Sequence, residues 1–181
     1  WQGGLSIYGA LLGFLATSIV FLRKYGYNLW LWFDLMMPSI LFGLIILQLA
    51  NFMMQFSLGT PLGLDIPNDH SLAEYVEYRY RPTGFEAYQY FQPVALYQAF
   101  AYSIVFMISV LCLLINRKYK FLAEGTVFLF SVILMAIIRF GIGFMYFSVN
   151  KDMLLYPMQW IALTVMIATV FIYVVKRFQH N

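Results

Sequence analysis

Five long apolar runs, separated by polar stretches, dominate the pattern of hydrophobic and polar positions along the chain. Each run is close to the roughly 20 residues that an α-helix needs to cross a bilayer. The runs predict membrane-spanning helices at about residues 5–22, 29–54, 94–115, 121–147 and 156–175. We therefore expect an all-α fold, a polytopic membrane helix bundle with five transmembrane helices in a single domain, residues 1–181.

The composition supports this class and excludes several others. Of the 181 residues, 62% are hydrophobic and only 10% are charged, whereas a soluble domain carries about 25% charged residues. The single cysteine, Cys112, rules out an internal disulfide, and His70 and His180 lack partners at metal-ligand spacing. The chain has no glycine-rich phosphate loop and no basic stripe, so we expect no metal, no cofactor and no nucleic-acid partner.

Positive charges alternate between the loops that separate the runs. Cations follow the first, third and fifth runs: Arg23, Lys24, Arg117, Lys118, Lys120, Lys176 and Arg177. Because cytoplasmic loops are enriched in Lys and Arg, the pattern predicts a cytoplasmic C-terminus and an extracellular loop at residues 55–93. The chain begins at Trp1 rather than Met, so we expect further residues before it.

Several polar residues interrupt the second run. Gln48, Asn51 and Gln55 follow a helical spacing that would place all three on one face. Such groups are costly at membrane depth unless they find partners, so two interpretations stay open. They are either hydrogen-bonding contacts between helices or part of a binding site. Asp34, near the other end of the run, reads as an interfacial charge.

Arg139 is the strongest single signal because it lies well inside the fourth run. A guanidinium there needs acceptors, which are either an anionic lipid headgroup or a structural partner. Tyr8 reads as an interface anchor or as a hydrogen-bond donor and general acid. Tyr97, Gln98 and Gln159 lie at the same predicted end of the bundle, where a site open to lipid could form.

The loop at residues 55–93 begins with turn-forming glycines, prolines and Asn68, and continues as EYVEYRYR. Its tyrosines and arginines suit headgroup depth, which indicates an aromatic belt. The alternative is a lid over a lipid or peptide site. A further hypothesis is that Arg79 or Arg81 supplies a cation to the site below the loop.

Five segments in order resemble the prolipoprotein diacylglyceryl transferase family of bacterial membrane enzymes. They are WQGGLSIYGALLG (1–13), DLMMPSILFGLIILQLANF (34–52), YFQPVALYQAF (90–100), GTVFLFSVILMAIIRF (125–140) and YPMQWIAL (156–163). The resemblance implies a multi-pass protein of the bacterial plasma membrane. It also implies transfer of a diacylglyceryl group from phosphatidylglycerol to the lipobox cysteine of a prolipoprotein. The partners would then be membrane phospholipid and the prolipoprotein.

The resemblance also implies roles for individual residues. Tyr8 and Arg139 match catalytic positions of the family, and the positions of Gln48, Asn51, Tyr97 and Gln159 would contact lipid. Of these, Gln48 stands where the family has an essential arginine.

Other family positions also differ here. A second arginine is replaced by Tyr146, a second asparagine by Met54, and carboxylates are replaced by Phe56, Gln98 and Gly143. Because two cations and three carboxylates are lost, we expect a catalytically impaired relative, a lipid-binding or scaffolding subunit of a membrane assembly with other membrane subunits. The alternative is an active transferase. A small-solute transporter is a weaker third possibility, because the runs show no paired broken helices.

Overall fold

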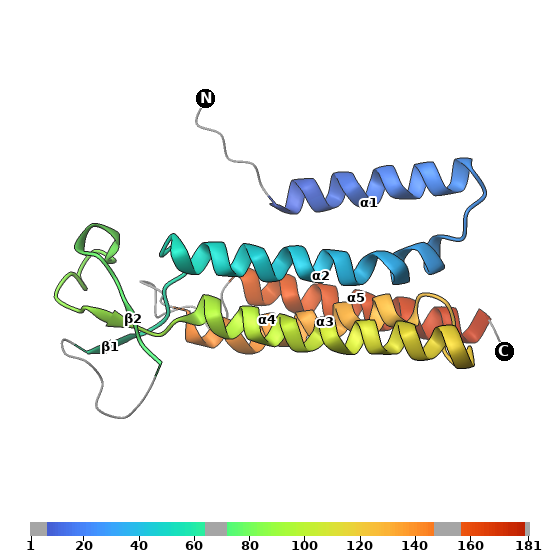
Figure 1. Cartoon of the computed structure of the whole chain (residues 1–181). Coiled ribbons are helices and arrows are strands. Elements are labelled where there is room, and N and C mark those ends of the chain that lie inside the picture. The colour runs from blue at the N-terminus through green and yellow to red at the C-terminus, as the bar shows by residue number, and fades with distance from the viewer. Residues whose placement is uncertain (1–6, 64–71, 147–156, 180–181) are drawn as a thin grey trace.

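The computed structural model describes residues 7–63, 72–146 and 157–179, in which five α-helices form the main body (Figure 1). They are α1 (Ile7–Lys24), α2 (Leu29–Met53), α3 (Val94–Tyr119), α4 (Thr126–Ile142) and α5 (Pro157–Gln179). Four candidate membrane spans are found among the described residues, at Leu29–Met53, Val94–Tyr119, Thr126–Met145 and Met158–Lys176. The helical class is confirmed, whereas a fifth span in α1 and the cytoplasmic C-terminus stay predictions.

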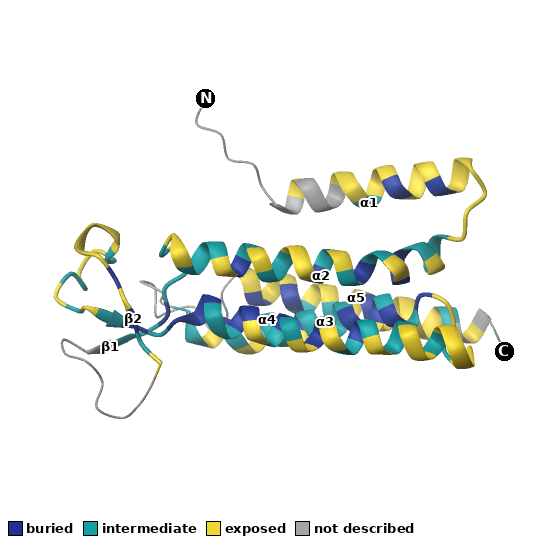
Figure 2. Ribbon diagram, viewed as in Figure 1, coloured by how far each residue is buried: buried dark blue, intermediate teal, exposed yellow. Residues whose placement is uncertain are grey.

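Helices α2, α3, α4 and α5 pack side by side, and α1 lies along α2 at the edge of the bundle (Figure 1). The core cluster joins Met37 and Leu41 of α2 to Val105 of α3, with α4 side chains packed against it. Ser109 and Ser131 are both buried, and a hydrogen bond of 2.7 Å between their hydroxyls joins α3 to α4. Many residues on the outer helix faces are exposed, as Figure 2 shows. A large number of them are bulky and apolar, which suits a lipid environment.

Asp34 fixes the start of α4, and the prediction of an interfacial charge there is wrong. It is only 2% exposed, and its carboxylate accepts hydrogen bonds from the backbone N–H groups of Gly125 (2.6 Å) and Phe128 (2.7 Å). These donors have no partner within the first turn of a helix, so the carboxylate replaces the missing acceptors. Gly125 itself has φ +81° and an ideal Cβ there would lie 2.5 Å from the Trp30 ring, so only glycine fits.

The fourth span is therefore shorter than the expected 121–147. The turn at residues 120–125 precedes α4, and Lys120 ends α3 in the left-handed conformation at φ 49°. A 3₁₀ turn, Gly143–Met145, then continues α4. Residue 147 lies outside the described residues.

A small sheet follows α2, where the sequence indicated only turns. Its strands are β1 (Pro61–Gly63), β2 (Glu74–Tyr75) and β3 (Tyr90–Phe91), all antiparallel, in the order β1-β3-β2. The strands are short, and part of the connection between β1 and β2 lies outside the described residues. We call this end of the bundle, with residues 54–63 and 72–93, the loop end. The opposite end, with residues 25–28 and 117–125, is the basic end.

Backbone hydrogen bonds attach the sheet to the helices. The Gly59 N–H donates to the Gln92 carbonyl, and the Gln92 N–H donates to the Thr60 carbonyl, each at 3.1 Å. The Thr60 N–H donates to the Met145 carbonyl at 3.1 Å, and Gly59 forms a bridge with Tyr146. The loop is thus hydrogen-bonded to the 3₁₀ turn after α4 as well as to the residue pair before α3.

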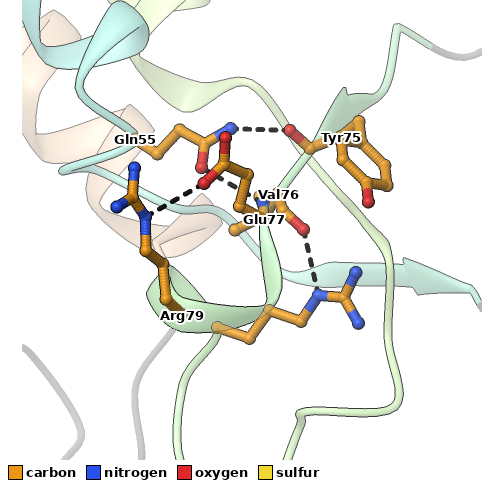
Figure 3. A network of polar contacts seen from close by, with 6 residues as sticks. Gln55, Tyr75, Val76, Glu77 and Arg79 are labelled. Carbon is orange, nitrogen blue, oxygen red and sulfur yellow. Dashed lines mark hydrogen bonds and ion pairs between the residues drawn. The ribbon is translucent and has the colours of Figure 1, made fainter.

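Gln55 holds the loop rather than sharing a face with Gln48 and Asn51, so that prediction is wrong. The residue lies beyond the end of α2 with φ 53°. Its Nε2 donates to the Tyr75 carbonyl at 2.8 Å, and its Oε1 accepts from the Glu77 N–H at 3.2 Å (Figure 3). Because α2 ends at Met53, the helical spacing no longer applies at residue 55.

Candidate functional site

Gln98 forms a polar network with Tyr102 and Tyr146 at the loop end. Gln98 on α3 has no exposed surface. Its Nε2 donates to the Tyr102 hydroxyl at 2.8 Å, and its Oε1 accepts from the Tyr146 hydroxyl at 2.9 Å. Gln98 and Tyr102 lie four residues apart and so share one face of α3, while the Gly59 bridge holds the backbone of Tyr146. The contact joins α3 to the segment after α4.

Gln159 on α5 fills the space beside the 3₁₀ turn that follows α4. The side chain is 1% exposed, and its Nε2 donates to the Phe140 carbonyl at 3.3 Å. An ideal Cβ on Gly143 would lie 2.5 Å from Gln159 Cγ and 2.9 Å from its Cδ and Nε2. Real Cβ atoms do not approach other atoms so closely, so position 143 has no room for a side chain while Gln159 holds this conformation.

Gln48 and Asn51 contact each other on α2. Gln48 is 3% exposed, and its Oε1 accepts from Asn51 Nδ2 at 3.2 Å. The prediction that these two residues share a face is confirmed by this contact. It leaves open whether the pair also contacts a ligand.

Arg139 and Tyr97 occupy two further positions at this end. Arg139 Nη2 lies 3.9 Å from Met158 Sδ, and a thioether is a weak acceptor for a guanidinium. Tyr97 donates from its hydroxyl to the Leu72 carbonyl at 3.4 Å, so it joins α3 to the loop. Tyr8 lies in α1, but its side chain is outside the described part of the structure. The roles expected for these residues stay predictions.

The two loop arginines bind within the loop itself. Arg79 forms an ion pair with Glu77 at 3.0 Å, as Figure 3 shows. Arg81 Nε donates to the Val76 carbonyl at 2.9 Å, and its Nη1 donates to the Glu86 carbonyl at 2.8 Å. The contacts of Arg81 give its guanidinium group a structural role in the loop, whereas the ion pair of Arg79 is exposed to solvent. The hypothesis that one of them serves the site below therefore gains no support from their positions.

Glu74 is a buried carboxyl group that the sequence analysis did not single out. It lies on β2, is 6% exposed, and its Oε2 has no hydrogen-bond partner among the described residues. Burial raises the pKa of Glu74 to about 7, because removal from water penalises the charged form. The alternation in EYVEYRYR is the only signal that could have indicated a strand with one buried face.

The chemistry available at the loop end follows from these groups. Amides and phenols donate and accept hydrogen bonds but carry no charge, and Arg139 is the cation that the sequence places within this part of α4. A phosphate is bound most strongly by charge-assisted hydrogen bonds, so Arg139 is the natural contact for an anionic headgroup. Within the described residues, no group of three or more His, Cys, Asp or Glu side chains could hold a metal ion.

Comparisons with known proteins agree with the resemblance seen in the sequence. A family model described as prolipoprotein diacylglyceryl transferase matches residues 1–175. The phosphatidylglycerol–prolipoprotein diacylglyceryl transferase of Geobacillus kaustophilus is 30% identical over 178 residues, 98% of this chain and 63% of the relative. Its counterpart in Shouchella clausii is 30% identical over 179 residues, which is 97% of this chain and 61% of the relative.

The chain spans about three fifths of the length of these curated relatives. No solved structure matches it. The family match covers nearly the whole sequence and agrees with the apolar helices of the structure, so the expected multi-pass membrane class is confirmed. The chain therefore belongs to the prolipoprotein diacylglyceryl transferase family.

Proposed function

We propose that this chain is a non-catalytic member of the family that keeps the membrane fold and acts as a lipid-binding or scaffolding subunit of a membrane assembly. The observation that carries the proposal is the hydrogen bond of 2.9 Å between Tyr146 and Gln98. The resemblance places an arginine of the family at the first position and a glutamate at the second. Here the two replacements contact each other, so the neutral pair forms a satisfied structural contact.

A neutral pair changes what the site can do. Transfer of a diacylglyceryl group forms a bond from the thiol sulfur to a glyceryl carbon and breaks the bond from that carbon to a phosphate oxygen. Glycerol phosphate leaves with negative charge, and the thiol proton passes to a base. Neither a phenol nor an amide supplies positive charge to the phosphate, and the amide does not accept the proton at neutral pH.

The packing around Gly143 also supports the proposal. The resemblance places a family glutamate at this position, and Gln159 occupies the volume that its side chain would need. Glycine supplies no carboxylate, and Gln159 fills the space in which one would lie. Loss of one charged contact to a transition state costs about 10²–10³ in rate, and several such contacts are absent here.

An active transferase is the second candidate, and Arg139 favours it. This arginine matches a charged position of the family and lies in α4 beside Met158, a weak acceptor that a phosphate oxygen could replace. In this reading Arg139 binds the headgroup of phosphatidylglycerol, and Tyr97, Asn51, Gln48 and Gln159 supply neutral contacts. The peptide substrate would be a prolipoprotein with a lipobox cysteine.

A direct transferase assay separates the two candidates. The purified protein is mixed with phosphatidylglycerol and a lipobox peptide, and the mass of the peptide is followed, beside the Geobacillus kaustophilus relative as the active control. We expect no diacylglyceryl adduct from this chain. An adduct that forms with the wild-type protein and disappears in Arg139→Ala would overturn the proposal and establish the second candidate.

A further inference from the structure

A cavity of about 1040 Å³ lies at the basic end, the end of the bundle opposite the candidate site. Its apolar wall comes from two helices: Leu31, Leu35 and Pro38 of α2, and Val110, Leu113 and Leu114 of α3. Pockets for small ligands typically measure about 300–1,000 Å³ and are lined mainly by apolar groups. The cavity is therefore large enough for part of an extended amphiphile.

The polar rim of this cavity carries more positive than negative charge. Arg117, Lys120 and Lys176 line it, against the carboxylate of Glu124. Glu124 already accepts a hydrogen bond from Asn28 Nδ2. The nearby Asp34, which binds the first N–H groups of α4, is a second acidic group, so three basic residues face two acidic ones here. The rim thus has an excess of cations.

Lys176 is the most informative of these cations. Its Nζ is almost completely shielded from solvent and has no hydrogen-bond acceptor among the described residues. It lies 4.3 Å from the centre of the Trp30 ring, a cation–π contact that compensates part of the burial. Because its Nζ is shielded, Lys176 adds positive charge behind the rim but does not present its ammonium group to a ligand in the cavity.

The apolar wall is open toward the side of the bundle. Leu35 is 58% exposed and Leu114 is 60% exposed. Both belong to helices that are long and apolar enough to span a membrane, so these side chains would face lipid. An acyl chain from the surrounding bilayer can therefore lie along these leucines without crossing the protein. Its headgroup would then reach the rim near Arg117 and Lys120.

We propose that this cavity binds an anionic phospholipid of the surrounding membrane, with its phosphate at Arg117 and Lys120 and an acyl chain along Leu35 and Leu114. Basic pockets between membrane helices are suited to anionic headgroups, whereas a zwitterionic headgroup brings a further positive charge to a positive rim. The site is distinct from the loop end and does not depend on whether the chain is a transferase.

The test measures lipid preference on the purified protein. The protein is placed in phosphatidylcholine nanodiscs that contain increasing amounts of phosphatidylglycerol, and retained lipid is counted by native mass spectrometry. We expect phosphatidylglycerol to be retained in preference to phosphatidylcholine. Each basic residue near an anionic headgroup contributes about fivefold to affinity, so Arg117→Gln with Lys120→Gln should lower the preference by about 25-fold.

The chain offers matched controls for charge and for shape. Lys118→Gln removes a cation between the two test positions that does not line the cavity, and it should change the preference less than twofold. Leu114→Trp should block the wall without a change of charge, whereas Leu111→Trp on the same helix lies outside the lining and should not. Both leucines are exposed, so folding should be retained.

Four results would overturn the proposal. Equal retention of the two lipids removes the preference for an anionic headgroup. A preference that survives Arg117→Gln with Lys120→Gln, or that falls equally with Lys118→Gln, places the lipid elsewhere, for example at the loop end. Complete displacement of the lipid by inorganic phosphate makes the cavity a site for a soluble anion.

Discussion

The two ends of the helix bundle satisfy their polar groups in different ways. At the loop end, buried amides and phenols pair with one another, as in the contacts of Gln98 with Tyr102 and Tyr146. At the basic end, charged groups carry the structure: Asp34 binds the start of α4, and Lys176 lies against Trp30. The comparison shows that neutral side chains satisfy one another at the loop end, whereas at the basic end charged side chains contact backbone and aromatic groups.

Replacement of Asp34 by alanine should have the largest effect on stability. The change removes both acceptors from the N–H groups of Gly125 and Phe128 in a buried site. Hydrogen bonds to a charged group contribute about 1.5–3 kcal/mol each, so we expect the free energy of unfolding to fall by about 3 kcal/mol. Thermal unfolding in detergent, followed by circular dichroism, measures this loss.

Glu124→Ala is the matched control at the basic end. Glu124 is exposed and accepts its hydrogen bond from the side chain of Asn28 rather than from the backbone of α4. The control should lower stability by less than about 1 kcal/mol. Equal losses in Asp34→Ala and Glu124→Ala would mean that Asp34 does not fix the start of α4.

Gly143→Ala tests whether the loop end is packed as tightly as the structure indicates. The new Cβ would lie 2.5 Å from Gln159 Cγ, and overpacking of this kind costs about 1–3 kcal/mol. Gly141→Ala is the control two residues earlier in α4, because its Cβ would meet no atom within 4 Å. That change should stabilise the helix slightly, since alanine is the better helix former. Similar melting temperatures for the two variants would contradict the packing at Gly143.

The helices could be predicted from the sequence because they depend on long apolar runs, which a membrane helix requires along its whole length. The start of α4 could not, because it depends on Asp34, which is 91 positions before Gly125. The small sheet was missed for a similar reason. Its strands contain only two or three residues each and are defined by pairing between distant segments.

The candidate site was predicted in part. The positions of Gln98 and Gln159 were identified in sequence, but their partners were not, since Tyr146 and Phe140 lie on other elements of the fold. Gln55 was misplaced because a helical spacing was extended past the true end of α2. Periodicity therefore located polar residues along the bundle, and it failed where a helix ended.

Glu74→Gln tests whether the one buried carboxyl group described at the loop end makes the stability of the loop depend on pH. The folded pKa of Glu74 is about 7, above its ordinary value of 4.5, so the folded loop binds the proton more tightly than the unfolded loop does. Its contribution to stability is complete below pH 4.5 and is lost as the pH rises through about 7. The full pKa shift corresponds to about 3 kcal/mol, which solvent screening of the carboxylate reduces to about 1–2 kcal/mol. The glutamine variant stays neutral, so we expect the loop to be more stable than wild type by about that amount at pH 8 and equal to it at pH 4.

Hydrogen exchange at the Val76 and Gln92 amides, corrected for intrinsic rates, reports on this loop, because both amides donate to carbonyls within it. Glu77→Gln is the control, since Glu77 is an exposed carboxylate in an ion pair with Arg79. Loop protection that changes with pH to the same extent in wild type and Glu74→Gln would assign the titration to another group.

Tyr146→Phe should have the smallest effect, and it asks whether the neutral pair at the loop end is a stabilising contact. The change removes the hydroxyl donor and leaves Gln98 Oε1 buried without this partner, at a cost of about 1 kcal/mol. Tyr119→Phe is the control, because Tyr119 is 66% exposed on α3, and it should change the melting temperature little. Gln98→Leu combined with Tyr146→Phe should cost less than the sum of the single changes, because the leucine has no acceptor to leave unpaired. Additive losses would mean that Gln98 and Tyr146 contribute to stability independently and do not act as a pair.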